Sequence, residues 1–229
     1  CTFCDQAATT ARRRSPQKVI DEIKHCVEKY GTREISFWDD TMSYHKKWMV
    51  EFCNLLIDAK LDLIWSCYAA INTVNKEILE LMAKAGCWNI FYGYETGVEV
   101  LAQNIKTNRK NRSMDYIMKV TKWTKDAGIE IRGSFMIALP GETPELAEQT
   151  IKDAIKLDPH YAQFSITTPY PGTALYNEIK DGKYEYILTG GSINFRPLGD
   201  RYPYIDDFIK KNYSTYKEIN SWRILQINN

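Results

Sequence analysis

Two cysteines separated by two residues stand at the start of the chain, in Cys1-Thr2-Phe3-Cys4. Thiolates at this spacing can bind one metal centre together. Taken alone, the pair is compatible with half of a zinc site, with a thioredoxin-like redox pair and with part of an iron–sulfur site. A zinc site needs a second cysteine pair or a histidine pair, and the three histidines of the chain lack that spacing.

Polar residues also follow several apolar runs that we interpret as strands. Asp39 and Asp40 follow the first run, Glu95 the third, Glu142 the fourth and Thr168 the fifth. In a parallel barrel the carboxyl ends of the strands meet at one rim, so these side chains predict a polar cofactor site there. The alternative is that each acid only caps the helix after its strand.

An alternation of strands and helices positions these residues. The expected strands are Arg33–Asp40, Leu61–Cys67, Trp88–Tyr94, Ile129–Leu139 and Tyr161–Thr167. Helix-start signals, such as Ser15-Pro16 and Thr143-Pro144, precede apolar residues at helical spacing. This alternation is typical of βαβ units, and the nearly continuous apolar strand cores predict a parallel sheet covered on both faces. Right-handed crossovers leave two possible architectures, an open doubly wound sheet and a barrel. The chain has no Gly-rich nucleotide-binding motif, so the nucleotide-binding versions of these folds are unsupported.

The end of the chain does not follow this alternation. Residues 184–204 are rich in Gly, Tyr and Pro, and they show no clear period. Residues 206–227 carry apolar side chains at roughly helical spacing, which predicts a helix there. We therefore expect a core over residues 1–183 and a partly helical C-terminal extension over residues 184–229.

Composition excludes several classes of protein. The 229 residues have a formal net charge of +1, which argues against a nucleic-acid-binding surface. Hydrophobic residues make up 44% of the chain, more than a disordered chain would carry. No apolar stretch approaches the ~20 residues of a membrane span. The six cysteines are too sparse for a secreted disulfide framework, so we expect a reduced, cytoplasmic protein.

The remaining cysteines receive different interpretations. Cys26 and Cys53 lie on apolar helix faces and are expected to be core residues. Cys87 and His160 precede strands, at the end away from the rim, and are expected to be structural. Cys67 ends a strand, and we leave open whether it faces substrate at the mouth of the barrel.

The ordered motifs of the chain resemble the radical S-adenosylmethionine (SAM) superfamily. That family carries CxxxCxxC with an aromatic residue before its last cysteine, and Cys1, Phe3 and Cys4 match the second cysteine, the aromatic residue and the third cysteine. Further matching segments occur in the order of the family, over about residues 1–180. They are RRSP (13–16), FWDD (37–40), WSC (65–67), AGC (85–87), GYETG (93–97), FMIALPGET (135–143) and TPYPGT (168–173). The nearest branch is the one whose members often carry an N-terminal cobalamin-binding domain.

The resemblance implies a (βα)6 partial barrel of the TIM type, with a parallel sheet whose first strand is missing from this chain. It also implies a [4Fe–4S] cluster that is held by three thiolates, two of them Cys1 and Cys4, and that binds SAM through its open iron. One electron from the cluster would break the sulfonium C5′–S bond of SAM, and the 5′-deoxyadenosyl radical would abstract a hydrogen atom. The implied SAM contacts are Phe3, Asp39, Asp40, Glu95, Met136 and Thr168.

The same resemblance implies a small-molecule substrate, a flavodoxin- or ferredoxin-type electron donor, and cobalamin bound through a domain outside this chain. The reaction would be a methylation, a cyclisation or a rearrangement. We expect an N-terminally truncated piece that is inactive alone, because the first cluster cysteine is absent. Relatives often carry Arg where Ala70 stands and acids where Asn72 and Asn75 stand. These departures leave a second hypothesis open, a truncated or degenerate non-catalytic barrel that acts as a binding scaffold. A zinc-binding α/β module is a third hypothesis.

Overall fold

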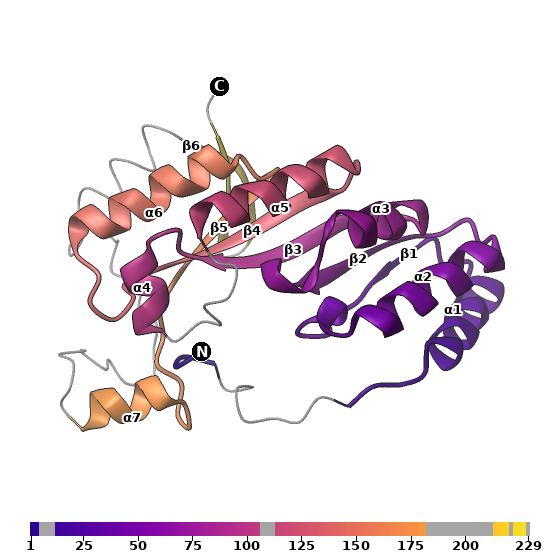
Figure 1. Cartoon of the computed structure of the whole chain (residues 1–229), viewed down its shortest axis with the longest axis horizontal. Helices are drawn as coiled ribbons and strands as arrows, with labels where there is room; N and C mark the ends of the chain where they lie inside the picture. The colour runs from indigo at the N-terminus through magenta and orange to yellow at the C-terminus, as the bar shows by residue number, and fades with distance from the viewer. Residues whose placement is uncertain (5–11, 106–112, 182–212, 220–221, 228–229) are drawn as a thin grey trace.

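A parallel sheet forms the centre of the structure, a computed structural model that describes residues 1–4, 12–105, 113–181, 213–219 and 222–227. Its five parallel strands stand side by side in chain order (Figure 1). They are β1 Glu34–Ser36, β2 Ile64–Ala69, β3 Cys87–Glu95, β4 Glu130–Ile137 and β5 Tyr161–Ile166. The predicted α/β class and the parallel partial barrel are confirmed. The first expected strand is shorter than predicted, because residues 37–40 already belong to the following loop.

Helices connect the strands, as the alternation predicts. They are α1 Pro16–Tyr30, α2 Lys46–Ala59, α3 Lys76–Lys84, α4 Glu99–Asn104, α5 Met114–Asp126, α6 Pro144–Leu157 and α7 Ala174–Lys180, with 3-10 turns at Met42–Tyr44 and Ile71–Thr73. The side chains of Ser15 and Thr143 cap α1 and α6, each followed by a first-turn proline.

The two faces of the sheet differ. On the face toward the helices, side chains are buried, and the hydroxyl groups of Tyr92 and Tyr94 bond to Thr124 and Thr121 of α5 at 3.1 and 2.8 Å. A side chain would not fit at Gly133, because an added Cβ would lie 2.8 Å from Cδ2 of the Tyr94 ring. On the other face, the alternating residues of β2 to β5 are half-buried or exposed, except Met136 near the end of β4, which is buried against Leu101 and Ile105. This open inner face is the concave side of a partial barrel.

The core under the first two strands is aromatic. The rings of Phe37, Phe52 and Trp65 pack edge to face, with centroids 5.5–5.8 Å apart. The indole Nε1 of Trp65 donates to the carbonyl oxygen of Ala85 at 2.8 Å, which satisfies the polar atom of this fully buried side chain. These contacts fix α2 and the end of α3 against the sheet.

The prediction of a helix within residues 206–227 is wrong. Two antiparallel strands, β6 Tyr213–Ile219 and β7 Trp222–Ile227, extend the sheet beyond β5, in the order β5-β7-β6. The segment is rich in β-branched and aromatic residues, which suit strands as well as helices, and short apolar patterns do not separate the two. Residues 184–204 lie outside the described residues.

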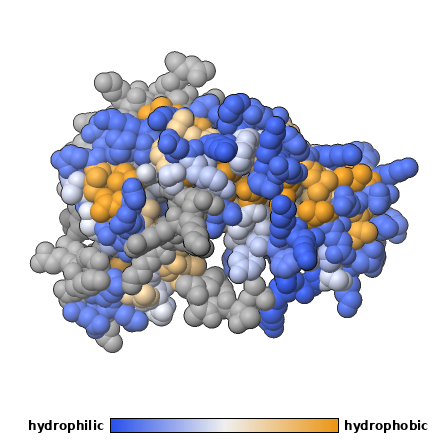
Figure 2. Space-filling model, viewed as in Figure 1, coloured by the Kyte–Doolittle hydropathy of each residue, from blue (hydrophilic) through white to orange (hydrophobic). Residues whose placement is uncertain are grey.

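Most of the visible surface is hydrophilic, with smaller hydrophobic patches (Figure 2). Across the described part of the chain, no helix combines the length and the apolar character that crossing a membrane requires.

Candidate active site

The N-terminal turn is fixed at the carboxyl end of the sheet by its central residue. The backbone N–H of Thr2 donates to the carbonyl oxygen of Ile105 after α4 at 3.0 Å, and the N–H of Leu175 in α7 donates to the carbonyl oxygen of Thr2 at 2.8 Å. Figure 1 shows the N-terminus beside α4 and α7. The N–H of Cys4 donates to the carbonyl oxygen of Cys1 at 3.4 Å, which closes the turn between the two thiols.

The donor set of this turn suits an iron–sulfur cluster in part. Neither thiol forms a disulfide; Cys1 is exposed and Cys4 is half-buried. Between them, the hydroxyl Oγ1 of Thr2 is buried and has no hydrogen-bond partner among the described residues. Two accessible thiols in one turn fit two ligands of a cluster. Within the described ranges, no three His, Cys, Asp or Glu side chains converge to bind one metal ion.

Phe3 and Met136 belong to one hydrophobic cluster. Met136, near the end of β4, packs with Leu101 and Ile105 of the α4 region, and Phe3 packs against this group. The structure therefore brings together two residues that the family resemblance assigns to SAM. The other assigned residues lie along the same carboxyl edge. Asp39 and Asp40 are exposed after β1, Glu95 ends β3, and Thr168 is exposed after β5.

The backbone at Glu95 is held in an unusual conformation. Its φ angle is +61°, in the left-handed region that residues with a side chain rarely adopt. The next residue, Thr96, is buried, and its hydroxyl oxygen lies 2.9 Å from that of Thr150 on α6. Beyond it, Gly97 lies against Asp153 of α6, whose Oδ2 is 2.2 Å from the position of an added Cβ. Helix α6 therefore holds the backbone that directly follows Glu95.

Glu142 is the acid that burial affects most at this edge. Its Oε2 accepts a hydrogen bond from the backbone N–H of Ala138, a residue whose φ angle is +63°. Burial raises the pKa of Glu142 to about 7, although hydrogen bonds from the backbone of Ala138 and Leu139 act in the opposite direction. Its Oε1 is buried and unpartnered among the described residues. The sequence places Glu142 at the rim, but the family resemblance does not include it among the SAM contacts. Its position in the family-matching segment FMIALPGET is the sequence feature that could have identified it as a site residue.

Helix capping does not account for the acids after the strands. The side chain of His45 caps α2 after Asp39 and Asp40, and that of Thr143 caps α6 after Glu142. The N-terminus of α4 after Glu95 has no side-chain cap. The capping alternative is therefore wrong for these positions.

Asn75 has a structural role. Its Oδ1 accepts a hydrogen bond from the backbone N–H of Ile78 at 3.0 Å and so caps α3. Asn75 therefore begins α3 as its N-cap.

Cys67 does not line the mouth of the barrel. It is buried on the helix-facing side of β2, in contact with Cys87 and near Cys53 of α2. Burial raises the pKa of the Cys53 thiol to about 12 and also raises the pKa of Cys87. The expected core role of Cys53 is confirmed. At the opposite end of the sheet, His160 is structural as predicted, because its Nδ1 accepts from the N–H of Ile131 at 3.0 Å.

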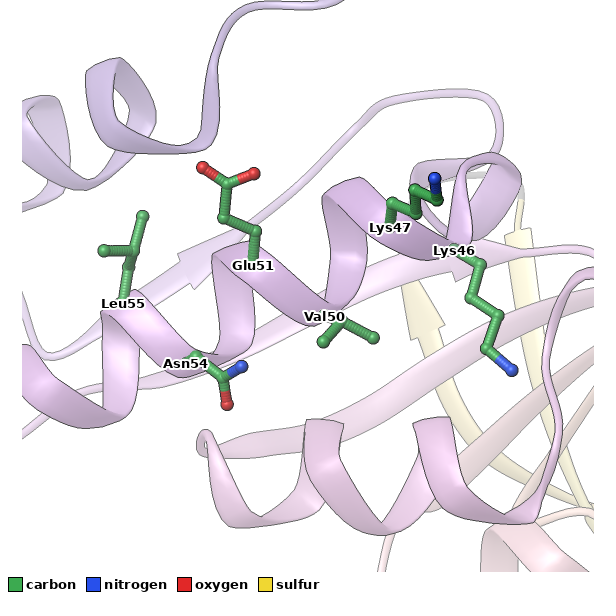
Figure 3. A pocket seen from close by; sticks show the side chains of 6 residues that line it. All are labelled: Lys46, Lys47, Val50, Glu51, Asn54 and Leu55. Carbon is green, nitrogen blue, oxygen red and sulfur yellow. The ribbon is translucent and has the colours of Figure 1, made fainter.

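A second concave feature lies on the outer surface of α2. Six residues line it, namely Lys46, Lys47, Val50, Glu51, Asn54 and Leu55. Figure 3 shows Glu51 and Leu55 on one side of the helix and Val50 and Asn54 on the other. All six belong to one helix, so this is exposed helix surface and not a site where several elements meet.

Comparisons with known proteins agree with this geometry. Residues 1–154 match the Radical SAM superfamily. An uncharacterised methyltransferase of Pyrococcus horikoshii is 33% identical over 96% of this chain and 46% of its own length. The anaerobic magnesium-protoporphyrin IX monomethyl ester cyclase of Rubrivivax gelatinosus is 28% identical over 79% of this chain and 33% of its own length.

A solved structure shows the same fold. The radical SAM methyltransferase TsrM of Kitasatospora setae, with tryptophan and a SAM analogue bound, superposes with a TM-score of 0.74 at 18% identity, over 99% of this chain and 46% of that chain. The chain thus spans a third to a half of the length of these proteins.

Proposed function

We propose that the chain, which belongs to the radical SAM superfamily, forms the core of an enzyme that cleaves SAM reductively and acts on a small-molecule substrate. The observation that carries this proposal is the Cys1–Cys4 turn, held at the carboxyl edge of a parallel sheet beside Phe3 and Met136. In this proposal the core covers residues 1–183, and residues 184–229 form a C-terminal extension.

Cys1 and Cys4 would supply two thiolates to a [4Fe–4S] cluster, and the third would precede Cys1 by four residues, as in the CxxxCxxC motif. When bound, the cluster and SAM together supply an adenosyl radical that can take a hydrogen atom from the substrate. The hydrogen bonds of Thr2 would hold the turn at the correct depth above the sheet.

The remaining site residues would bind and orient SAM. Phe3 and Met136 form an apolar surface suited to adenosine, and Thr168 lies two strand ends beyond Glu95 along the rim. Glu95, Asp39 and Asp40 would place carboxylates near the ammonium and sulfonium groups of SAM, where opposite charges attract. The orientation of Glu95 would depend on α6.

The relatives suggest the reaction. A methyltransferase and a cyclase both match most of this chain, so methyl transfer and ring closure on an organic substrate are the proposed reactions. Cobalamin would be bound by a separate domain, and a flavodoxin or ferredoxin would supply the electron. All six cysteines are free of disulfides, which suits a reducing cytoplasm.

Cluster reconstitution tests the proposal. Protein expressed with the residues that precede Cys1 is reconstituted with iron and sulfide without oxygen, and 5′-deoxyadenosine is measured after dithionite reduction. We expect Cys1→Ala and Cys4→Ala to lose cluster iron and product. Cys26→Ala, a half-buried cysteine of α1, is the matched control and should retain both. Folded, cluster-loaded protein that forms no 5′-deoxyadenosine, or protein with stoichiometric zinc and no iron, would contradict the proposal.

A further inference from the structure

A row of aromatic side chains crosses the open inner face of the sheet. Tyr68 of β2 is in register with Phe91 of β3, and Phe91 is in register with Arg132 of β4. The centroids of the Tyr68 and Phe91 rings are 4.8 Å apart, and the Arg132 guanidinium carbon lies 5.7 Å from the Phe91 centroid. Trp38, after β1, extends the row, with its ring 5.8 Å from that of Tyr68.

The row is accessible. Trp38 is 79% exposed, Tyr68 and Phe91 are half-buried, and Arg132 is exposed. Strands stand about 4.8 Å apart, so the four side chains from Trp38 to Arg132 cover roughly 14 Å. On the helix-facing side of the same strands, side chains of similar size are fully buried. The side chains of the inner row are therefore not part of the hydrophobic core between the sheet and the described helices.

Small and polar residues separate the row from the rim. One step nearer the carboxyl end on this face, Gly93 is in register with Ser134, and Ser134 with Gln163. Met136 and Glu95 come one further step along the strands. Two residues of a strand span roughly 7 Å, so the row lies roughly 7–13 Å below the proposed SAM position. A ligand on the row must be extended along the strands to reach the rim.

Arg132 gives the row a charge preference. Its guanidinium stacks on Phe91 and makes no ion pair with a described residue. A guanidinium keeps its charge and offers a planar fork of donors to a carboxylate or phosphate. Aromatic faces favour flat rings with which they can stack. An apolar ligand without an acidic group would stack on the rings but would not pair with the Arg132 guanidinium.

We propose that this row, Trp38-Tyr68-Phe91-Arg132, binds the substrate, and that the substrate is an extended, flat, conjugated molecule with an acidic group. The rings stack on the conjugated system, and Arg132 pairs with the carboxylate or phosphate. The acidic end is thereby held away from the rim, and the opposite end points toward Glu95 and Met136. This inference rests on the proposed function, since it names the substrate class of the same enzyme.

Equilibrium binding of simple probes tests the substrate class. The planar acid 1-pyrenebutyrate is titrated while its emission is followed, and it is compared with the neutral 1-pyrenebutanol and with octanoate, an acid without a ring. Pyrenylmethyl phosphate distinguishes a phosphate preference from a carboxylate preference. We expect pyrenebutyrate to bind at least about fivefold more tightly than either control ligand, because only it engages both the rings and the cation.

Two variants separate the contributions. Arg132→Gln should weaken pyrenebutyrate binding about fivefold to tenfold and leave pyrenebutanol within twofold, since only the charge is lost. Phe91→Leu should weaken both pyrene ligands. The matched control is Arg33→Gln, an exposed arginine paired with Asp62 outside the row, and it should change neither. Equal binding of octanoate and pyrenebutyrate, or an Arg132→Gln variant that binds pyrenebutyrate unchanged, would overturn the inference.

Binding of these probes needs neither the cluster nor turnover, so the two proposals fail separately. Protein that forms 5′-deoxyadenosine but shows no preference for the planar acid retains the proposed function and loses this inference. Protein that prefers the planar acid but never cleaves SAM retains this inference and contradicts the proposed function. Thermal melting of each variant confirms that it is folded. If Phe91→Leu does not fold, pyrenebutyrate binding by folded Arg132→Gln still tests the inference.

Discussion

The carboxylate of Glu95 lies over the backbone of Gly93, so that a Cβ on Gly93 would come 2.5 Å from its Oε1. Both residues stand at the carboxyl end of β3, and Glu95 has a positive φ angle. The glycine thus leaves the space that this carboxylate occupies. In the proposed site, the close approach keeps the acid beside the sheet, facing the position of SAM.

Gly93→Ala should therefore displace the Glu95 carboxylate. If that carboxylate binds the cationic end of SAM, the KM for SAM should rise about tenfold, the size expected for one charge-assisted contact. Glu95→Gln should raise it by a similar factor. The double variant should be no worse than either single variant, because both remove the same contact. Additive effects, or an unchanged KM in Gly93→Ala, would argue against a SAM contact at Glu95.

Glu142 should make stability depend on pH between about 5 and 7. Burial raises its pKa in the folded protein to about 7, above its ordinary value of 4.5. Between these values the folded state holds the proton and the unfolded state loses it, so stability falls as pH rises toward 7 and is constant above. Allowing for partial solvent screening, we expect a loss of about 1–2 kcal/mol.

Glu142→Gln should remove this dependence, because a neutral amide oxygen can still accept from the N–H of Ala138. Urea unfolding at pH 5 and pH 8 measures it, and the variant should gain stability relative to the original protein at pH 8. Glu145→Gln is the control. That exposed acid has a lowered pKa, so it is ionised in both states over this range and its removal should leave the slope unchanged. A Glu142→Gln variant with the original slope would refute the assignment.

The packing of α6 against the loop after β3 gives a stability prediction. A Cβ on Gly97 would lie 2.2 Å from Oδ2 and 2.9 Å from Cβ of Asp153, which is too close for the side chain to rotate away cheaply. Gly97→Ala should cost about 1–3 kcal/mol of unfolding free energy. Adding Asp153→Ala should restore part of the loss, because that carboxylate is the clashing group. Urea unfolding of both single variants and the double variant measures the coupling energy, and additive losses would contradict the packing.

The helices and strands predicted for the barrel agree with the structure where a helix-capping signal or a run of apolar residues marks the element in the sequence. Ser15-Pro16 and Thr143-Pro144 begin helices as expected, and the apolar runs around Ile90 and Ile131 are strands. The pattern could not separate strand from helix after residue 206, where the apolar residues fit both periods. Tertiary pairing with β5 decides the outcome there.

The site was less readable from the sequence. A motif can place Glu95 and Met136 at the rim, but it cannot show that α6 holds the Glu95 loop or that Phe3 joins Met136 across the chain. Cys67 is the clearest example. Its position at a strand end suggested the mouth of the barrel, yet a side chain at any strand position faces one side or the other. Only the register shows that Cys67 faces the helices.

The cysteines should divide into two classes in native alkylation. Cys1 is exposed and Cys4 half-buried, whereas Cys53, Cys67 and Cys87 are buried, and burial raises the pKa values of Cys53 and Cys87. Because the thiolate is the reactive form, iodoacetamide at pH 8 should modify the first two residues and spare the last three. Mass spectrometry of the digested protein measures the labelling. After cluster reconstitution, Cys1 and Cys4 should also become protected while the accessible part of Cys26 keeps reacting. Rapid native labelling of Cys67 would show that it reaches the open face of the sheet after all.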